Sequence, residues 1–292
     1  MFVIRAGLVL CCAVFVCGNA SAGVVSQVTD LLLFERFCPD SDNEADCIAE
    51  TNADASKRQG YLDSSADGAF VEVSNGEGSW GDMVLDPTQL NLPQSHMHIE
   101  SNPNERRTIG ALGVQEYLWQ GVSDTLTFTS NFDFTMSLGD WNGTVDSYAY
   151  AEIGVYRDLN IEFDSSGHVI FPISDNPADL IAFASYESAN DTSLLSNVLR
   201  QVVLSVSFEV NPGDTFYLEG YVQGLAMNGG MFDAANSFLT NLTAATTPAQ
   251  NLSTALVPLT SVPLPSTLVL LGLGFVGLGL NRRKSAAHVQ PH

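Results

Sequence analysis

Apolar and polar residues alternate along the chain from about residue 110 onward, with the two-residue period of half-buried β-strands. The clearest run covers residues 125–136, and its apolar positions are Leu126, Phe128, Phe132, Phe134 and Met136. The alternation breaks at Ser130–Asn131, which we interpret as a bulge or slip. Similar strand patterns follow at 148–156, 159–163, 168–171, 202–210 and 215–222.

Turn-forming residues separate these runs. Asp164–Gly167 predicts a hairpin between two of them. Asn211–Asp214, with proline at its second position, predicts a turn that sends the chain back antiparallel. Strands at intervals of about ten residues predict an all-β body, an antiparallel β-sandwich or jelly-roll.

The pattern also suggests how the chain is divided. Residues 23–105 are expected to form an acidic N-terminal part of the body, residues 106–247 the β-sandwich, and residues 248–261 an uncharged linker. Residues 24–37 are compatible with a strand or a short helix, and residues 178–200 with a short helix or a long loop.

The first 22 residues are typical of a secretory signal peptide, predicted as a helix. One positive charge at Arg5 precedes an apolar core at 6–16, and Ala20–Ala22 provides small residues for cleavage. Cleavage between Ala22 and Gly23 would make Gly23 the mature N-terminus. The alternative is a lipoprotein signal that uses Cys12 or Cys17.

A short apolar segment near the other end is predicted to be a hydrophobic helix. It runs from Thr267 to Leu280 and would span about 20 Å, below the usual length of a membrane crossing. Three basic residues follow it, Arg282, Arg283 and Lys284, as expected on the cytoplasmic side of a membrane anchor. We therefore expect transient or permanent contact with the inner membrane; the alternative is a buried helix of a soluble domain.

The residues before this helix carry a family resemblance. Val262, Pro263, Leu264 and Pro265, followed by the Gly-Leu-rich run and the basic cluster, resemble the PEP-CTERM sorting domain of Gram-negative bacteria, here at 262–286. This sequence has Leu264 where the motif that names the family has glutamate. The resemblance implies export, processing by the transpeptidase-like exosortase, delivery to the cell surface or beyond, and association with exopolysaccharide and biofilms.

Two cysteines remain after the signal peptide, Cys38 and Cys47. In an oxidising compartment a disulfide between them is expected, closing a loop of about ten residues. The alternative of a redox or metal pair fits less well, because eight residues separate the cysteines and no histidine is close in sequence.

The mature body is strongly acidic. Between Gly23 and Ser261 lie all 33 acidic residues of the chain but only seven of its basic ones, a net charge of −26. A nucleic-acid partner is therefore not expected, because the phosphate backbone requires a basic face. Solubility alone is enough to explain the charge, although it also suits an extracellular protein surrounded by divalent cations.

No cofactor is certain from the sequence, but two segments could bind a metal. The first alternates acids through the cysteine loop, at Asp40, Asp42, Glu44 and Asp46, and is a candidate calcium site. It departs from the EF-hand pattern, so a solvated acidic loop is the alternative. The second places His96, His98 and Glu100 on one face of a strand, with His168 or another acid as a further ligand. The alternative there is an exposed polar strand face.

Aromatic residues offer a third kind of site. Trp80, Trp119 and Trp141 could stack against sugars, although core packing explains each of them as well. We find no nucleophile elbow, phosphate-binding loop, dinucleotide fingerprint or zinc-protease motif in the sequence.

These observations favour a non-enzymatic surface or matrix protein with a structural or adhesive role. The alternatives are a secreted hydrolase that acts on polysaccharide through two carboxyl groups, and a metal-dependent enzyme that uses His96, His98 and Glu100.

Overall fold

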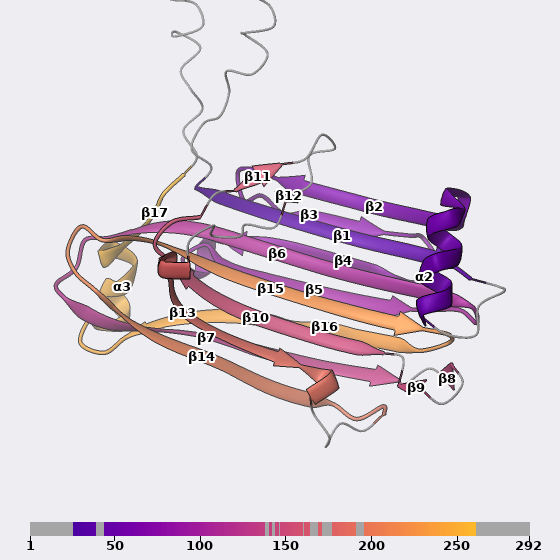
Figure 1. The fold of residues 1–292 in the computed structure, drawn as a ribbon. Helices are drawn as coiled ribbons and strands as arrows, with labels where there is room; N and C mark the ends of the chain where they lie inside the picture. The colour runs from indigo at the N-terminus through magenta and orange to yellow at the C-terminus, as the bar shows by residue number, and fades with distance from the viewer. Residues whose placement is uncertain are drawn as a thin grey trace, which may run out of the picture. The chain divides into compact units, whose positions relative to one another are not determined.

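Two antiparallel β-sheets packed face to face form the body of the protein in a computed structural model (Figure 1). The structure describes residues 26–38, 44–137, 140–141, 144–145, 147–159, 161–163, 169–170, 177–190 and 196–260. Within them, Ser26–Thr260 form one compact unit. The fold class expected from the alternation, an all-β antiparallel sandwich, is confirmed.

The strands of each sheet come from all parts of this unit. The first sheet has the order β13 (Leu180–Glu187), β10 (Tyr148–Tyr156), β15 (Thr215–Met227), β6 (Glu105–Trp119), β1 (Gln27–Phe37) and β2 (Arg58–Ser65), and β17 (Leu256–Pro258) also pairs with β6. The second has the order β14 (Arg200–Val210), β7 (Asp124–Ser137), β16 (Met231–Ala244), β5 (Leu92–Glu100), β4 (Trp80–Asp86) and β3 (Val71–Ser74). Two short pairs are separate, β8 (Asp140–Trp141) with β9 (Thr144–Val145) and β11 (Glu162–Phe163) with β12 (Val169–Ile170).

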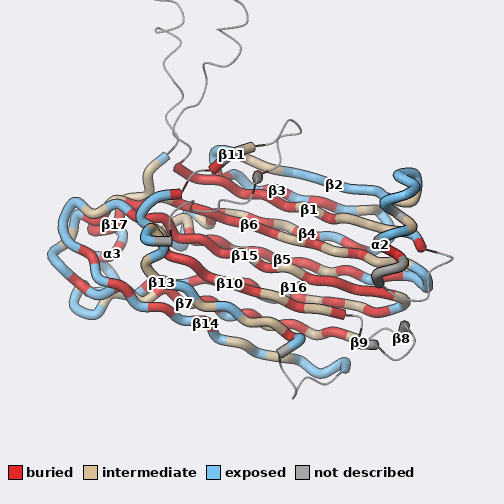
Figure 2. The backbone as a smooth tube through the Cα atoms, in the orientation of Figure 1, coloured by how far each residue is buried: buried red, intermediate tan, exposed pale blue. Residues whose placement is uncertain are grey.

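Strand β7 shows how the alternation builds the sandwich. Its even-numbered residues from Leu126 to Met136 are all buried, and the red and lighter stretches of Figure 2 follow the same period. The bulge expected at Ser130 is absent: β7 pairs with β14 in unbroken register through that residue. Ser130 keeps the parity of the apolar positions and simply occupies a core position as a small polar residue.

The core between the sheets is rich in aromatic rings. Phe132, Phe134, Phe232 and Phe238 are at most 1% exposed and lie within 4.8–6.5 Å of one another where they pair. Tyr186 of β13 packs on Phe132 and Phe134 from the opposite sheet. Strand β13 occupies Leu180–Glu187 of the region 178–200, where a short helix or long loop was expected, because alternate residues of this strand pack against the core.

The Phe232 ring of this cluster packs directly against the backbone of Gly224 on β15. A Cβ atom there would overlap the Phe232 ring, which is fully buried. We expect Gly224→Ala to lower the free energy of unfolding by about 1–3 kcal/mol, because an overpacked core must shift ring or backbone. Urea unfolding would measure it. Gly60→Ala is the control, since a Cβ there would meet the Phe34 ring at an ordinary 3.5 Å; equal stability of the two variants would contradict the prediction.

The division of the chain differs from the expected one in two places. Strands β1 to β5 belong to the same two sheets as later strands, so no boundary lies at residue 105. Residues 248–261 are not simply a linker, because α3 (Ala249–Ala255) and β17 fold back onto the sandwich. Leu252 and Leu256 are buried there, and this apolar contact holds the segment in place.

Turns also connect the sheets in ways that local sequence does not reveal. The turn at Asn211–Asp214 forms, with Gly213 at φ +93° as its third position requires. The two strands it joins lie in different sheets, however: β14 pairs with β7, and β15 pairs with β6 and β10. The hairpin expected across Asp164–Gly167 is present in its described part, as β11 paired with β12.

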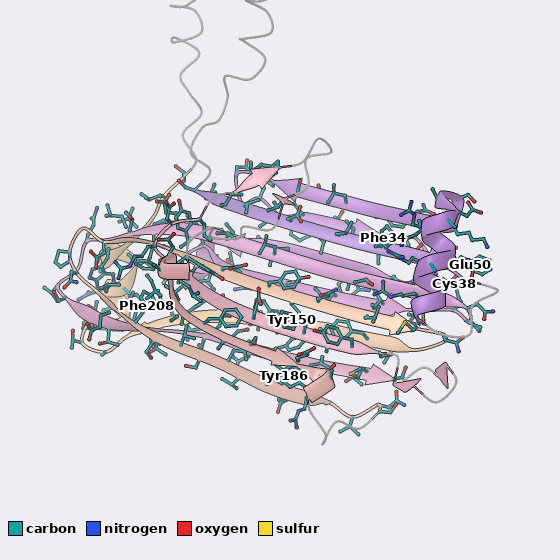
Figure 3. The ribbon with its side chains drawn as sticks, in the orientation of Figure 1. Phe34, Cys38, Glu50, Tyr150, Tyr186 and Phe208 are labelled. Carbon is teal, nitrogen blue, oxygen red and sulfur yellow. A yellow bond between two sulfur atoms is a disulfide. The ribbon has the colours of Figure 1, made fainter. Side chains whose placement is uncertain are left out.

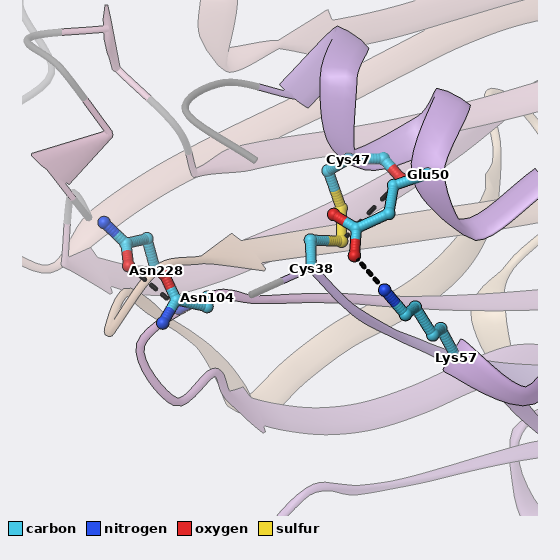
Figure 4. Close-up of a disulfide and its surroundings, with 6 residues drawn as sticks. All are labelled: Cys38, Cys47, Glu50, Lys57, Asn104 and Asn228. Carbon is cyan, nitrogen blue, oxygen red and sulfur yellow. Dashed lines mark hydrogen bonds and ion pairs between the residues drawn. A yellow bond between two sulfur atoms is a disulfide. The ribbon is translucent and has the colours of Figure 1, made fainter. Parts of the chain in front are cut away.

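A disulfide joins Cys38, at the end of β1, to Cys47 in helix α2 (Glu44–Ala53), with 5.1 Å between their Cα atoms (Figure 4). Beside it, Glu50 of the helix pairs with Lys57. In the same view Asn104 donates its backbone N–H to Asn228 Oδ1 at 3.0 Å. Cys38 and Cys47 are fully buried, and they form one apolar cluster with the buried residues Leu225 and Met227 of β15. The disulfide therefore fixes α2 against one end of the first sheet.

Candidate functional site

A tryptophan stands on the outer face of the second sheet, near its β3 edge. Trp80 begins β4 and retains 36% of its exposed area. The register places Ser74 of β3 on one side of it and His98 of β5 on the other. Asp233 of β16 lies opposite His98 in the next strand. One row across four strands thus combines an indole ring, a hydroxyl, an imidazole and a carboxylate.

The neighbouring row carries a histidine–carboxylate pair. His96 Nδ1 lies 2.8 Å from Asp82 Oδ1, and the two residues are opposite each other on β5 and β4. The hydrogen bond to Asp82 raises the pKa of His96, against the opposing effect of partial burial. Asp82 is two residues after Trp80, so strand alternation places both side chains on the same outer face.

His98 has different carboxylate neighbours. Its Nε2 lies 3.3 Å from Glu100 Oε1, and its Nδ1 lies 3.6 Å from Asp233 Oδ1. His96 and His98 are thus directed to separate acids, on an outward strand face. Among the residues that the structure describes, no group of three or more His, Cys, Asp or Glu side chains could hold a metal ion. His168 lies outside that part of the chain, so the proposed metal-dependent chemistry remains a prediction.

The calcium prediction lies mostly outside the described residues as well. Asp40 and Asp42 are not described, and neither are the side chains of Glu44 and Asp46. The backbone of Glu44 and Asp46 belongs to α2 rather than to a loop. Calcium binding stays a prediction.

The Trp80 row borders a hollow of about 370 Å³ lined by Glu72, Val73, Ser74, Trp80, Gly81 and Asp82. Its wall combines one aromatic face with carboxylate and hydroxyl oxygens. An apolar ring together with a few fixed polar groups is the usual composition of a small-molecule site. Such a wall can stack against the C–H face of a sugar while its oxygens accept hydrogen bonds from the hydroxyl groups. We call this the Trp80 hollow.

The other tryptophans do not contribute to an exposed site in the described structure. Trp119 is fully buried, and its indole N–H donates to the carbonyl of Val122 at 2.7 Å. It is a core residue, as the alternative reading of the sequence held. The side chain of Trp141 lies outside the described residues. Asp82 was not among the candidate residues selected from the sequence, although its position two residues after Trp80 on a strand is a signal that points to it.

A second hollow, of about 460 Å³, lies at one end of the sandwich. Four of its lining residues are basic, Arg36, Lys57, Arg58 and Arg107. Arg107 is already surrounded by carboxylates, and its side chain is 3% exposed. We interpret Arg107 as structural, because its buried guanidinium pairs with three carboxylates of the protein.

The sorting segment matches a known family. The family model of the PEP-CTERM protein-sorting motif matches residues 261–284. These residues, including Val262–Pro265, Thr267–Leu280 and Arg282–Lys284, lie outside the described structure. Within the described part, no helix has both the length and the apolar character needed to cross a membrane.

Comparisons of the body give only distant likenesses. No curated protein matches the sequence. One similar structure is the enzymatically active domain of tailspike protein 4 of bacteriophage CBA120, at 9% identity and TM-score 0.24, covering 60% of this chain. The match spans 19% of that chain, about a fifth of its length.

Two others are carbohydrate-binding modules. TmCBM61, solved with β-1,4-galactotriose, has 10% identity and TM-score 0.24, with 60% of this chain and 90% of that chain covered. A module described as promiscuous in specificity, from the β-sandwich superfamily, has 9% identity and TM-score 0.24, with 64% and 68% covered. No functional conclusion is drawn from likenesses this distant. The chain does carry a PEP-CTERM protein-sorting motif at residues 261–284, and this motif indicates an exported protein that exosortase sorts to the cell surface.

Proposed function

We propose that this protein is a non-enzymatic component of the cell surface or extracellular matrix that binds exopolysaccharide through the Trp80 hollow. The observation that carries the proposal is the position of Trp80, an indole ring left 36% exposed on a sheet face and bordered by polar oxygens. Exposed aromatic residues flanked by hydrogen-bonding groups are characteristic of binding surfaces. The sorting motif supports the proposal, because it delivers the protein to where polysaccharide is found.

The polar neighbours of Trp80 are held in place. Asp82 accepts bonds from both the ring and the backbone N–H of His96, at 2.8 and 3.3 Å. These bonds fix the carboxylate beside the indole before any ligand arrives. A preorganised group loses less conformational entropy on binding than a mobile one. His96 is thus expected to position Asp82, and Trp80 to make the main apolar contact.

Truncating the indole should weaken polysaccharide binding. We expect Trp80→Ala to lower affinity roughly tenfold or more, the effect typical of removing an aromatic anchor. Affinity electrophoresis of the purified exported protein, in gels containing the exopolysaccharide of the producing cells or one of a panel of neutral and acidic polysaccharides, would measure it. Trp80→Phe should retain part of the affinity.

The matched control is Val203→Ala, which removes an apolar side chain that is 68% exposed on β14 of the same sheet. That variant should migrate like the wild type. Unaltered migration of the wild type in every gel, or equal retardation of wild type and Trp80→Ala, would rule out the Trp80 hollow as the binding site.

A further inference from the structure

The outer face of the first sheet carries a concentration of tyrosines. Strand alternation places Tyr148, Tyr150 and Tyr156 of β10 on this face, and Tyr217 and Tyr221 of β15 beside them. Figure 3 labels Tyr150 on the face of β10 turned toward the viewer. The inward positions of the same strands hold alanine, valine, leucine, isoleucine, glycine and one phenylalanine, Phe216, so these five tyrosines are not part of the core between the sheets.

One end of this face is covered by the disulfide. Cys38, Cys47, Leu225 and Met227 form a buried cluster, and Tyr148 packs against it. The cluster limits the open part of the face on the α2 side.

The other end is covered by described residues between β10 and β13, among them Leu159 and Val169. Val28 and Val114 point outward from the first sheet, yet both are fully buried. Leu159 and Val169 are buried too, and the Val169 N–H lies 3.5 Å from Asp30 Oδ1. Apolar contact between these two residues and the outer face of the sheet explains why Val28 and Val114 are buried.

Three rings lie together between these covers. The Tyr148 and Tyr150 rings stack with centroids 6.3 Å apart and planes inclined by 8°. The Tyr150 and Tyr221 rings lie 6.0 Å apart at 57°. Gly110 of the adjacent strand leaves room for the Tyr221 ring, since a Cβ there would lie 3.2 Å from its hydroxyl. All three tyrosines are half-buried, with part of each still accessible. We call these three rings, with Glu152 and Gln223, the tyrosine band.

Acidic side chains accompany the rings. Tyr150 donates its hydroxyl to Glu152 Oε2, and Tyr148 Oη lies 3.5 Å from Glu187 Oε1. Glu219 is 2% exposed, and its burial, together with the charge of Glu152, raises its pKa to about 8. Strands β10, β13 and β15 contain no lysine or arginine. Glu219 therefore holds its proton at neutral pH, and the negative charge beside the rings comes from Glu152 and Glu187, with no cation on these three strands to neutralise it.

We propose that the tyrosine band binds a sugar polymer that carries protonated amines, of the glucosamine class. A cation over the face of an aromatic ring is attracted by the ring quadrupole, and neighbouring carboxylates strengthen that attraction. The ring faces also accept the C–H face of the sugar, and a sheet face suits an extended chain. Charge complementarity selects this occupant, because the body carries a net charge of −26. The proposal does not rest on the Trp80 hollow, which is on the other sheet.

Calorimetry of the purified exported protein with two oligosaccharides of equal length tests it. One is an oligomer of glucosamine and the other its fully N-acetylated form, which lacks the charge. We expect the amine form to bind at least roughly tenfold more tightly, and added salt to reduce that preference through screening. Tyr150→Ala should lower the affinity for the amine oligosaccharide roughly three- to tenfold, since one cation–π contact is lost.

Three further variants complete the test. Tyr150→Phe keeps the ring and should bind within about twofold of the wild type. Glu152→Gln keeps the shape of the side chain and removes its charge. It should weaken binding of the amine oligosaccharide and leave binding of the N-acetylated one unchanged. Trp80→Ala should bind it normally, which separates this site from the proposed one. Equal affinity for both oligosaccharides, or loss of amine binding in Trp80→Ala but not in Glu152→Gln, would overturn the proposal.

Discussion

Replacing Arg107 with methionine is expected to lower the free energy of unfolding by about 3–5 kcal/mol, the usual cost of removing one partner from a buried ionic cluster. The Arg107 guanidinium lies 3.1 Å from Glu35, 3.0 Å from Glu77 and 2.9 Å from Glu105. It also donates to the carbonyl of Glu100 at 2.7 Å. Without it, the mostly buried carboxylates of Glu35 and Glu105 would face each other in a poorly solvated site, while the exposed Glu77 would remain hydrated.

The position of Arg107 explains the size of the effect. Its strand β6 and Glu35 of β1 belong to the first sheet, whereas Glu77 lies in the turn between β3 and β4 of the second. One side chain thus connects the two sheets at the end of the sandwich. A lysine ammonium group cannot reproduce the five N–H donors of the planar guanidinium. Arg107→Lys should therefore recover only part of the stability that Arg107→Met loses.

Urea unfolding of the purified exported protein, with Arg58→Ala as control, would measure the difference. Arg58 is exposed on the edge strand β2, and its replacement should change stability by less than about 0.5 kcal/mol. A loss below about 1 kcal/mol in Arg107→Met would show that the cluster is hydrated and that the carboxylates do not need their partner.

Strand alternation predicted much of the sandwich because it depends on local sequence. The alternation predicts the inward residues of β7 correctly. Ser130, which we interpreted as a break in the pattern, also lies at one of the inward positions. The assignment of strands to sheets could not be read, because the turn at Asn211–Asp214 is compatible with a hairpin and with a crossing between sheets. Only long-range packing decides between the two.

The sites illustrate the same limit. His96, His98 and Trp80 could be selected from residue type, but their grouping depends on the register of β3, β4, β5 and β16. Glu219 gave no signal: on β15 it alternates with apolar residues like any solvent-facing acid. It is buried because tertiary packing covers that end of the face, and no local pattern reveals which segment covers a given strand.

That burial leads to the second large effect, on the pH dependence of stability. The pKa of Glu219 is raised from 4.5 to about 8 by burial and by the nearby charge of Glu152, so the folded protein holds this proton at neutral pH while the unfolded chain does not. Stability therefore falls as the pH rises between these values. Each unit of pKa difference corresponds to about 1.4 kcal/mol, so the loss should reach several kcal/mol.

Glu219→Gln should remove most of this dependence, because glutamine resembles the protonated acid and cannot ionise. The variant should unfold at a similar urea concentration to the wild type near pH 5, and at a clearly higher one near pH 9. Glu152 also has a raised pKa, caused mainly by burial, so a smaller dependence of the same sign should remain. Glu209→Gln, at an exposed position on β14, should follow the wild type throughout. If Glu219→Gln and wild type lose stability in parallel between these pH values, Glu219 is ionised in the folded protein, and water must reach it beneath the tyrosines.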